Sequence, residues 1–445
     1  MSLPNRIYEN VIIPLSYYLR GDLRFLYYTG YKKNLRKTKK EIEKYQLKRL
    51  KKLIRHSYNT VPYYRELFDK NRITPEDIKS IEDLKKIPVL DKETILSNLN
   101  NLKSIKKYKL VEYTSGGSTG NRIVVFKDKR YEQISRGIWL RDMYSVGIRP
   151  GDKCAWIWGA SSENEKLAKK ILYKFLWRIN RRIILNAKHY TNAELKNWLL
   201  NDFNKFKPSF IYGYANSIYQ IAKFINENNI KIHQVEKIVA TSEKLEQREY
   251  IEKVFKCKVF DQYGSREILS IAIENDDKIM HSSDDFVIVE VSSDKKIILT
   301  PLESYGMPLI RYIIGDIGEK KQSTKNKKSH PFKEFNVSIG RLCEIFINRK
   351  KENVSMVPFM GTLSDAKIRV SEFQLVQNSI NAVQVNMVNE KDNVEQKEMN
   401  RLKQLIKNYL GCSQINVKYY KKYPLEKSGK KIMFKCMIEN ENTTN

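Results

Sequence analysis

The residues with the most chemical potential gather in four short segments that lie far apart in the chain. The first, residues 114–120, reads Thr-Ser-Gly-Gly-Ser-Thr-Gly. Its glycines leave backbone N–H groups bare, and its hydroxyls can donate to an anion. No Lys-Ser/Thr pair follows, so the segment is not a Walker A loop. Taken alone, it fits an anion-binding loop and an ordinary hairpin turn equally well.

Two further segments place a carboxylate close to a glycine. Residues 261–267 read Asp-Gln-Tyr-Gly-Ser-Arg-Glu, where Tyr263 can lie beside a flat base and Glu267 offers the oxygen ligands that Mg²⁺ prefers. Residues 308–316 read Pro-Leu-Ile-Arg-Tyr-Ile-Ile-Gly-Asp. We expect a glycine turn after a strand to present Asp316 to the two hydroxyls of a ribose. A turn at the end of a strand explains either segment as well when it is taken alone.

The fourth segment, residues 424–430, presents Lys430 on a Ser-Gly turn. A solvated lysine is the default in so basic a chain. In their order and spacing, however, the four segments resemble the adenylate-forming superfamily, and within it the phenylacetate–coenzyme A ligase family and its CapK branch, which is found with capsular polysaccharide genes. Residues 340–341, Gly-Arg, match the family's hinge motif. The likeness covers about residues 40–435.

The resemblance implies an enzyme that uses ATP and Mg²⁺ to join a small carboxylic acid to AMP and releases pyrophosphate. The acyl group then passes to CoA or to an amine or hydroxyl of a sugar precursor, in capsular or surface polysaccharide biosynthesis. Lys430, Glu267 and Thr119 are the expected catalytic residues, with Glu267 as the metal ligand. The expected nucleotide contacts are Ser115, Gly116, Gly117, Ser118, Thr119, Gly120, Tyr263, Gly264, Ser265, Arg266, Asp316 and Arg341.

The chemistry of the residues agrees with this reaction. A carboxylate is already a nucleophile, so its attack on a phosphate needs charge neutralisation and alignment instead of a general base. Only five histidines occur, and no Ser-His-Asp order is evident. Trp158, Tyr212 and Tyr214 are the predicted lining of the acid pocket, although such aromatics suit a hydrophobic core equally well. Because residues 347–363 lack the family's Gly-rich pattern, CoA is one of several acceptors left open.

Strands that alternate with helices would position these segments. We expect a basic amphipathic helix over residues 39–57 and a second helix over 129–145. Short strands are predicted at residues 111–113, 123–126, 154–158, 210–212, 237–240 and 258–260, and a hairpin at 286–299. The pattern predicts an α/β fold with a large, multi-subdomain N-terminal adenylation domain, residues 1–342. A small, mobile α+β lid would follow at residues 343–445.

The charge of the chain keeps a second class of function open. There are 82 Lys and Arg residues against 51 Asp and Glu, a net charge of +31. Such a balance favours nucleic acid, an anionic membrane surface or polyphosphate as a partner. The basic residues are spread along the chain, which favours a compositional bias, and a basic binding protein without catalytic activity would leave the four motifs unexplained. We therefore expect no specific nucleic-acid partner.

The N-terminal region bears on the location of the protein. No cleavable signal opens the chain, and the cysteines suggest no disulfide framework, so we expect a cytoplasmic protein. Residues 10–19 are apolar and tyrosine-rich but too short to span a bilayer. They fit a packed N-terminal segment or peripheral association with the inner face of the membrane. The sequence leaves the oligomeric state open.

Overall fold

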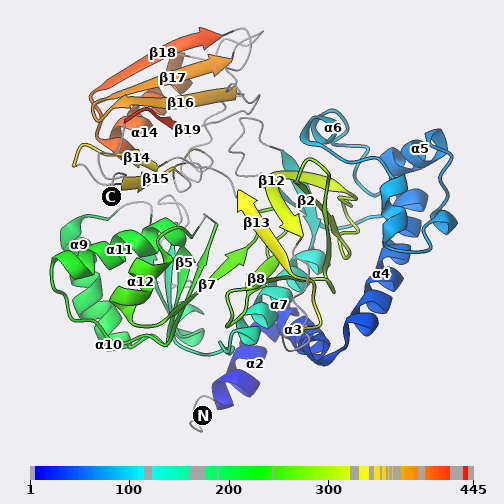
Figure 1. Cartoon of the computed structure of the whole chain (residues 1–445), viewed down its shortest axis with the longest axis horizontal. Coiled ribbons are helices and arrows are strands. Elements are labelled where there is room, and N and C mark those ends of the chain that lie inside the picture. The colour runs from blue at the N-terminus through cyan, green and yellow to red at the C-terminus, as the bar shows by residue number, and fades with distance from the viewer. Residues whose placement is uncertain are drawn as a thin grey trace.

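The computed structural model describes residues 6–114, 123–159, 176–187, 190–242, 245–320, 330–339, 345–350, 353–356, 359, 363, 372–388, 396–420 and 434–438. Within them, the strands form five sheets, and helices cover the largest sheet (Figure 1). The α/β fold class predicted from the alternation of strands and helices is confirmed.

A seven-stranded sheet has the strand order β4-β3-β5-β6-β7-β8-β9. Its first five strands are parallel, and β8 and β9 extend it in the antiparallel sense. Parallel strands end together at one edge of a sheet, where ligands commonly bind. The strands are β3 (Cys154–Trp158), β4 (Arg182–Asn186), β5 (Phe210–Tyr214), β6 (Lys237–Thr241), β7 (Lys258–Tyr263), β8 (Ala272–Glu274) and β9 (Met280–Ser282).

Helices lie on both faces of this sheet, as a parallel sheet requires. One face is covered by α9 (Asn192–Asn197), η5 (Trp198–Phe203), α10 (Asn204–Phe206), α11 (Ala215–Glu227) and α12 (Arg248–Phe255). In α11, Ile218, Ile221 and Ile225 recur at helical spacing and are buried. The other face packs against α7 (Lys129–Ser145), which contributes Trp139 and Met143 to a separate hydrophobic cluster.

A four-stranded antiparallel sheet, order β10-β11-β12-β13, lies beside the first. Its strands are β10 (Val287–Val291), β11 (Lys296–Pro301), β12 (Tyr312–Lys320) and β13 (Phe335–Ile339). A separate antiparallel pair consists of β1 (Leu110–Thr114) and β2 (Val124–Asp128). One hydrophobic cluster joins these strands to the N-terminal helices.

The N-terminal helices run from below α7 to the outer side of the antiparallel sheet (Figure 1). They are η1 (Tyr8–Ile12), α2 (Ile13–Tyr18), α3 (Arg24–Lys32), η2 (Lys33–Arg36), α4 (Lys39–Thr60), α5 (Pro62–Lys70), η3 (Pro75–Asp77), η4 (Glu82–Lys86) and α6 (Lys92–Ser97). The predicted helix at 39–57 is α4, which begins at a capping box: Glu41 N donates to Thr38 Oγ1, and Thr38 N donates to Glu41 Oε2. None of the described helices is both long and apolar enough to cross a bilayer.

The C-terminal part has a hydrophobic core of its own. A mixed sheet of order β18-β17-β16-β19 packs against α14 (Gln396–Leu410), which buries Leu402 and Ile406. The strands of this part are β14 (Ile345–Ile347), β15 (Asn353–Ser355), β16 (Glu372–Ser379), β17 (Ala382–Val388), β18 (Gln414–Tyr420) and β19 (Phe434–Cys436). The boundary near Cys343 and the mobility of this lid stay predictions.

Several predicted elements have the expected bounds, while two motif segments differ. The helix at 129–145 and the strand at 154–158 are confirmed, and β10 and β11 form the expected hairpin. The strand that begins at Lys258 runs on through Tyr263 instead of ending at Phe260. Asp316 lies within β12 instead of after it, because β11 and β13 pair with that strand on its two sides.

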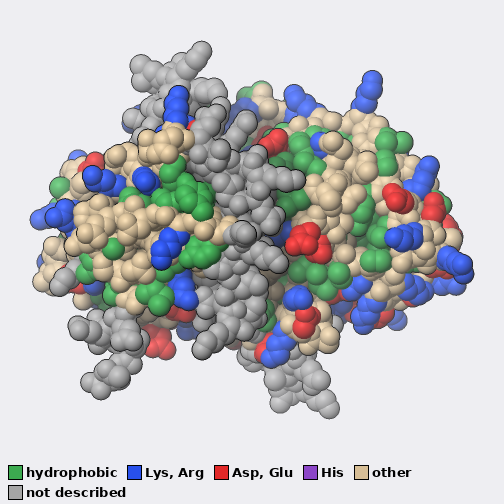
Figure 2. Space-filling model, turned by 90° about the horizontal axis from the view of Figure 1, so that it is seen from above, with side chains coloured by type: hydrophobic (Ala, Val, Ile, Leu, Met, Phe, Trp, Pro, Cys, Tyr) green, Lys and Arg blue, Asp and Glu red, His purple; other side chains and the backbone are tan. Residues whose placement is uncertain are grey.

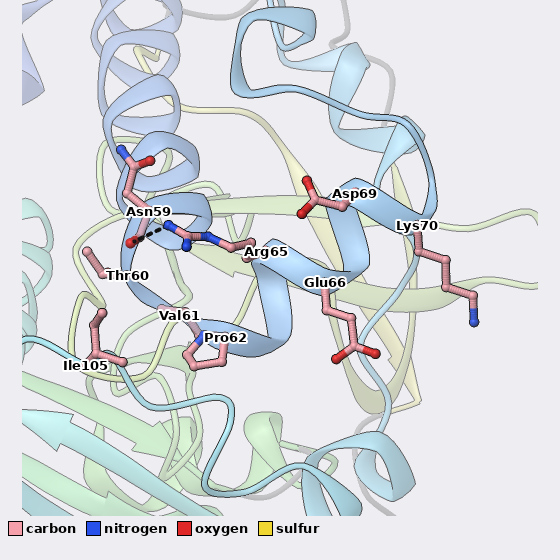
Figure 3. A pocket seen from close by; sticks show the side chains of 9 residues that line it. All are labelled: Asn59, Thr60, Val61, Pro62, Arg65, Glu66, Asp69, Lys70 and Ile105. Atoms are coloured by element: carbon pink, nitrogen blue, oxygen red, sulfur yellow. Dashed lines mark hydrogen bonds between the residues drawn. The ribbon is translucent and has the colours of Figure 1, made fainter.

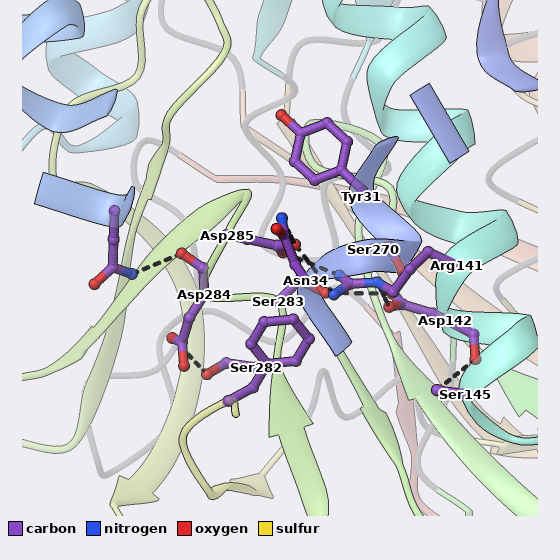
Figure 4. A network of polar contacts seen from close by, with 12 residues as sticks. Tyr31, Asn34, Arg141, Asp142, Ser145, Ser270, Ser282, Ser283, Asp284 and Asp285 are labelled. Atoms are coloured by element: carbon purple, nitrogen blue, oxygen red, sulfur yellow. Dashed lines mark hydrogen bonds and ion pairs between the residues drawn. The ribbon is translucent and has the colours of Figure 1, made fainter. Parts of the chain in front are cut away.

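A buried charged cluster joins the N-terminal helices, α7 and the segment before β10 (Figure 4). Arg141 is wholly buried, and its Nε lies 2.8 Å from Asp142 Oδ1. Its Nη2 lies 3.2 Å from Asp285 Oδ1, while Asn34 Nδ2 donates to Asp285 Oδ2 over 2.8 Å. Two carboxylates thus share one guanidinium, and removal of either would break a buried ion pair.

We expect Asp285→Asn to lower the free energy of unfolding by about 3–5 kcal/mol, because the substitution breaks the buried ion pair between Asp285 and Arg141. The matched control is Asp276→Asn, which removes an exposed partner of Lys258 and should cost less than about 1 kcal/mol. Urea unfolding, followed by tryptophan fluorescence, measures both. Equal midpoints for the two variants would contradict the role assigned to this cluster.

Candidate active site

Two motifs that are far apart in the sequence meet where the two large sheets adjoin. Tyr263 ends β7 of the parallel sheet, and Asp316 lies in β12 of the antiparallel sheet. The Tyr263 hydroxyl donates to Asp316 Oδ2 over 2.7 Å. The aromatic ring and the carboxylate that the sequence assigned to one ligand are therefore in direct contact.

A β-bulge lies in β12 next to Asp316. Ile298 pairs with Ile313, and Lys296 pairs with Ile317. Between these two cross-strand pairs, β12 has three residues where β11 has one. Within the bulge, Gly315 has φ +100°, a conformation that favours glycine. Burial alternates along β12, so that Asp316 is buried beside Tyr263 while Gly315 is exposed.

A tight turn follows Tyr263 and holds the rest of that motif. Ser265 N donates to the Ile268 carbonyl over 2.8 Å, and Ile268 N donates to Ser265 Oγ over 3.1 Å. A Cβ atom on Gly264 would lie 2.1 Å from the Leu269 carbonyl oxygen. Only glycine fits there, so the turn fixes the separation of Tyr263 from Glu267.

The turn delivers Glu267 to a buried position between the two sheets. The residue is 1% exposed, and the Tyr312 hydroxyl donates to its Oε1 over 3.4 Å. Within the described residues, no group donates a hydrogen bond to its Oε2. A buried carboxylate oxygen without a donor is costly unless something else satisfies it. This arrangement fits a divalent cation, which carboxylate oxygens bind readily.

Lys127 is a functional candidate that is not among the predicted site residues. Its side chain is 7% exposed, and Nζ donates to the Arg266 carbonyl over 2.5 Å. Burial lowers the pKa of Lys127 to about 8, and the nearby Glu267 carboxylate opposes that shift. The ammonium thus holds the backbone beside Glu267. Ile123, Val125 and Lys127 are buried in alternation, but Val124 and Phe126 between them are apolar too, so the sequence carries no alternation that could have identified Lys127.

The aromatic residues predicted for the acid pocket form one cluster at the carboxyl ends of β3 and β5. The rings of Trp158 and Tyr214 stack with centroids 4.3 Å apart, and those of Trp158 and Tyr212 lie 5.8 Å apart. Tyr212 is buried, whereas Trp158 and Tyr214 are half-buried. Tyr212 therefore belongs to the core beneath the other two rings, which remain accessible to a ligand.

A chain of hydrogen bonds connects these aromatics with the charged cluster. The Tyr212 hydroxyl donates to Gln262 Oε1 over 2.8 Å, and Gln262 Nε2 donates to Ser270 Oγ over 3.0 Å. The Ser270 hydroxyl in turn donates to Asp142. Gln262 directly precedes Tyr263. The same series of hydrogen bonds therefore positions Tyr212 in the aromatic cluster and the backbone next to Tyr263.

The remaining predicted site residues are placed as follows. Arg266 is exposed beside the turn, and Ser265 is half-buried within it. The other predicted contacts lie outside the described residues, namely Ser115, Gly116, Gly117, Ser118, Thr119, Gly120, Arg341 and Lys430. Tyr263, Gly264, Ser265, Arg266, Glu267 and Asp316 are those that the structure brings together.

Two cavities elsewhere contain none of these residues. One, of about 560 Å³, lies where α4 meets α5 and is open on one side, with Arg65, Glu66 and Asp69 along its rim (Figure 3). The other, of about 250 Å³, lies beside the stacked rings of His281 and His330. Neither adjoins Tyr263 or Asp316, so the candidate site rests on the motif contacts and not on cavity size.

We expect Gly264→Ala to destabilise the protein by about 1–3 kcal/mol, because the added methyl group overlaps a backbone carbonyl that cannot move aside cheaply. The control is Gly30→Ala in α3, where the new methyl group meets nothing within 4 Å. That change should stabilise by about 0.5–1 kcal/mol through helix propensity. Thermal unfolding of both variants measures the difference, and a shift of the same sign in both would refute this account of the turn.

Comparisons with known proteins find one matching family model and several relatives of this chain. A family model described as the CapK C-terminal domain matches residues 346–440. Protein CapK from Staphylococcus aureus is 27% identical over 379 residues, which cover 83% of each chain. Phenylacetate-coenzyme A ligase from Pseudomonas putida is 23% identical over 329 residues, 69% of this chain and 72% of the relative.

Solved structures agree in fold. A 2-hydroxyisobutyryl-CoA ligase in complex with 2-HIB-AMP and CoA has a TM-score of 0.58 at 16% identity, over 89% of this chain and 90% of that chain. The same ligase in its postadenylation state has a TM-score of 0.56 at 15% identity, over 92% and 91%. At such identities the likeness shows the fold alone. With the relatives above, it leads to one conclusion: the chain is similar to protein CapK and to the phenylacetate–coenzyme A ligases over most of its length, and its C-terminal part matches the CapK C-terminal domain.

Proposed function

We propose that this protein activates a small carboxylic acid with ATP, forming an acyl-adenylate and pyrophosphate, and then transfers the acyl group to an acceptor. The acceptor is CoA or an amine or hydroxyl of a precursor in capsular or surface polysaccharide biosynthesis. The observation that carries the proposal is the 2.7 Å contact of Tyr263 with Asp316, beside the buried Glu267.

The described residues would bind the nucleotide from two sides. Asp316 would accept hydrogen bonds from the ribose hydroxyls, and Tyr263 would place its ring beside the adenine. A bond from a hydroxyl to an ionised carboxylate is worth more than a bond between neutral groups. Since the bulge and the turn fix both side chains before binding, little freedom would be lost when the nucleotide enters.

Glu267 would hold Mg²⁺, which supplies charge neutralisation at the phosphates when it is bound. Lys127 would keep the Glu267 backbone in place through the Arg266 carbonyl. The loop at Ser115 to Gly120 is proposed to bind the triphosphate through its N–H and hydroxyl groups. The half-buried rings of Trp158 and Tyr214 would line the acid pocket, and they suit a flat or small acyl group.

The C-terminal part would act as a lid with a boundary near Cys343. Its separate hydrophobic core supports this division, because a part with its own core can rotate as a unit. Lys430 would reach the site on closure and stabilise the negative charge that develops between the acid and the α-phosphate. Arg341, in the hinge motif, would lie near the nucleotide.

The basic composition offers weaker support for the rival function of nucleic-acid binding. On the face seen in Figure 2, Lys and Arg side chains are distributed over both halves, with Asp and Glu among them. Many of the described lysines and arginines also pair with carboxylates, as Lys258 does with Asp276. A spread of paired charges lacks the basic stripe interleaved with aromatics that a binding groove for single strands requires.

The experiment that tests the proposal is acid-dependent pyrophosphate release from ATP and Mg²⁺, screened over amino, hydroxy and aromatic acids. At least one acid should give equal amounts of AMP and pyrophosphate. Asp316→Ala should bind ATP at least about tenfold more weakly, since it loses charge-assisted hydrogen bonds of about 1.5–3 kcal/mol each. Calorimetry measures that affinity, with Glu319→Ala on the same strand as the control. Absence of ATP binding by the wild type would end the proposal.

Lys430→Ala should lower acid-dependent pyrophosphate release by about a hundredfold or more while ATP affinity stays close to that of the wild type. It should still transfer the acyl group from synthetic acyl-AMP, because the charge that the lysine stabilises develops only in the first half-reaction. Lys427 and Lys431 flank it, and their alanine variants are the matched controls. Full adenylation by Lys430→Ala, or a defect confined to Lys431→Ala, would show that the lysine motif is placed wrongly.

A further inference from the structure

The N-terminal helical segment carries an exposed apolar stripe that the proposed function does not use. Residues 6–18 are helical throughout, as η1 and α2. Ile7, Val11 and Leu15 follow one another at intervals of four residues and are 45%, 54% and 51% exposed. Tyr18 and Leu19 continue the stripe and are 69% and 76% exposed. Large apolar side chains grouped in this way mark an interaction surface more often than scattered ones do.

The exposure does not come from a loosely attached end. On the inner side of the same segment, Ile13 and Tyr17 are buried. Glu9 is buried as well, and its carboxylate lies 3.7 Å from Arg149 Nη1. The Arg181 guanidinium lies 3.5 Å from the centre of the Tyr8 ring. The segment is therefore amphipathic and fixed to the body through one side, and it presents the other side to its surroundings.

The charge around the stripe is strongly positive. Residues 6–40 contain nine Lys and Arg residues and two acidic ones, a net of +7. Both acids are paired, Glu9 with Arg149 and Asp22 with Arg24. The exposed basic residues of this region are Arg6, Arg20, Lys33, Arg36, Lys39 and Lys40. An apolar stripe with basic flanks is the pattern of a helix that lies in the interface of an anionic membrane.

The stripe also has a suitable position on the molecule. In Figure 1, α2 projects at the edge of the molecule, at the end opposite the C-terminal sheet. A helix that projects in this way suits a lipid surface, which can deform around it. The proposed lid would stay in solvent and free to rotate when that end is bound.

We propose that Ile7, Val11, Leu15, Tyr18 and Leu19 form a membrane-docking surface that inserts into the interfacial layer of a bilayer containing anionic lipid. The apolar side chains supply the insertion, and the basic residues of 6–40 draw the protein to negatively charged headgroups. The surface is separate from the candidate active site, so docking would set the location of the enzyme without altering its chemistry.

The test is co-sedimentation of the full chain with vesicles made of equal parts of phosphatidylcholine and phosphatidylglycerol. The wild type should sediment with these vesicles and only weakly with vesicles of pure phosphatidylcholine. Leu15→Gln combined with Leu19→Gln should lower partitioning by about tenfold or more, because two inserted side chains are lost. The matched control, Leu96→Gln with Ile105→Gln, changes two other exposed apolar residues and should bind as the wild type does.

Acid-dependent AMP formation in solution should be equal in the wild type and both double variants, which separates this proposal from the proposed catalysis. No sedimentation of the wild type, or equal losses in the two double variants, would overturn the docking surface. The rival occupant is a second copy of this chain. A dimer in sedimentation velocity that Leu15→Gln with Leu19→Gln converts to a monomer, without vesicle binding by the wild type, would assign the stripe to that interface instead.

Discussion

The Arg141 side chain is positively charged but has no access to solvent. Its neighbours must therefore be arranged so that they stabilise a buried charge. Asp142 and Asp285 neutralise the guanidinium from two different elements, and Asn34 supports one of them from the N-terminal region. Burial raises the pKa of Asp142, whereas Arg141 opposes that rise. Loss of either buried ion pair would cost several kcal/mol, so these elements must keep their mutual positions for this part of the protein to be stable.

Hydrogen bonds connect this cluster with the candidate site and fix the positions of residues there. Asp142 accepts from Ser270, Ser270 accepts from Gln262, and Gln262 accepts from Tyr212. The chain of donors therefore extends from the charged interior to the aromatic cluster and reaches the residue that precedes Tyr263. In the proposed reaction, a site that aligns a carboxylate with a phosphate would gain from such rigidity, because alignment is the main contribution it could make before the proposed lid closes.

The periodicity of apolar residues correctly predicted those helices and strands for which the local conformational preference and the tertiary packing agree. The helix at 129–145 and the strand at 154–158 are of this kind, and so is α4 with its capping box. Asp316 was placed after a strand because Gly-Asp is a turn signal, but pairing with strands on both sides extends β12 and turns the signal into a bulge. Lys127 was not among the predicted site residues, because its contact with the Arg266 carbonyl joins segments far apart in the sequence and depends on tertiary packing. Motif order thus predicted which residues meet, whereas the way they meet depended on tertiary pairing.

The crossing of α3 and α7 connects the proposed docking surface with the charged cluster that supports the candidate site. Gly137 lies where α7 crosses α3, and a Cβ atom there would be 2.9 Å from the Arg24 carbonyl oxygen and from Tyr28 N. The two helices are therefore in backbone contact, with α3 leading from the apolar stripe and α7 carrying Arg141. A force applied to the N-terminal segment would reach the charged cluster through this crossing and not through a flexible tether. Docking at the stripe would hence orient the whole large domain, and the lid would remain the part free to move against it.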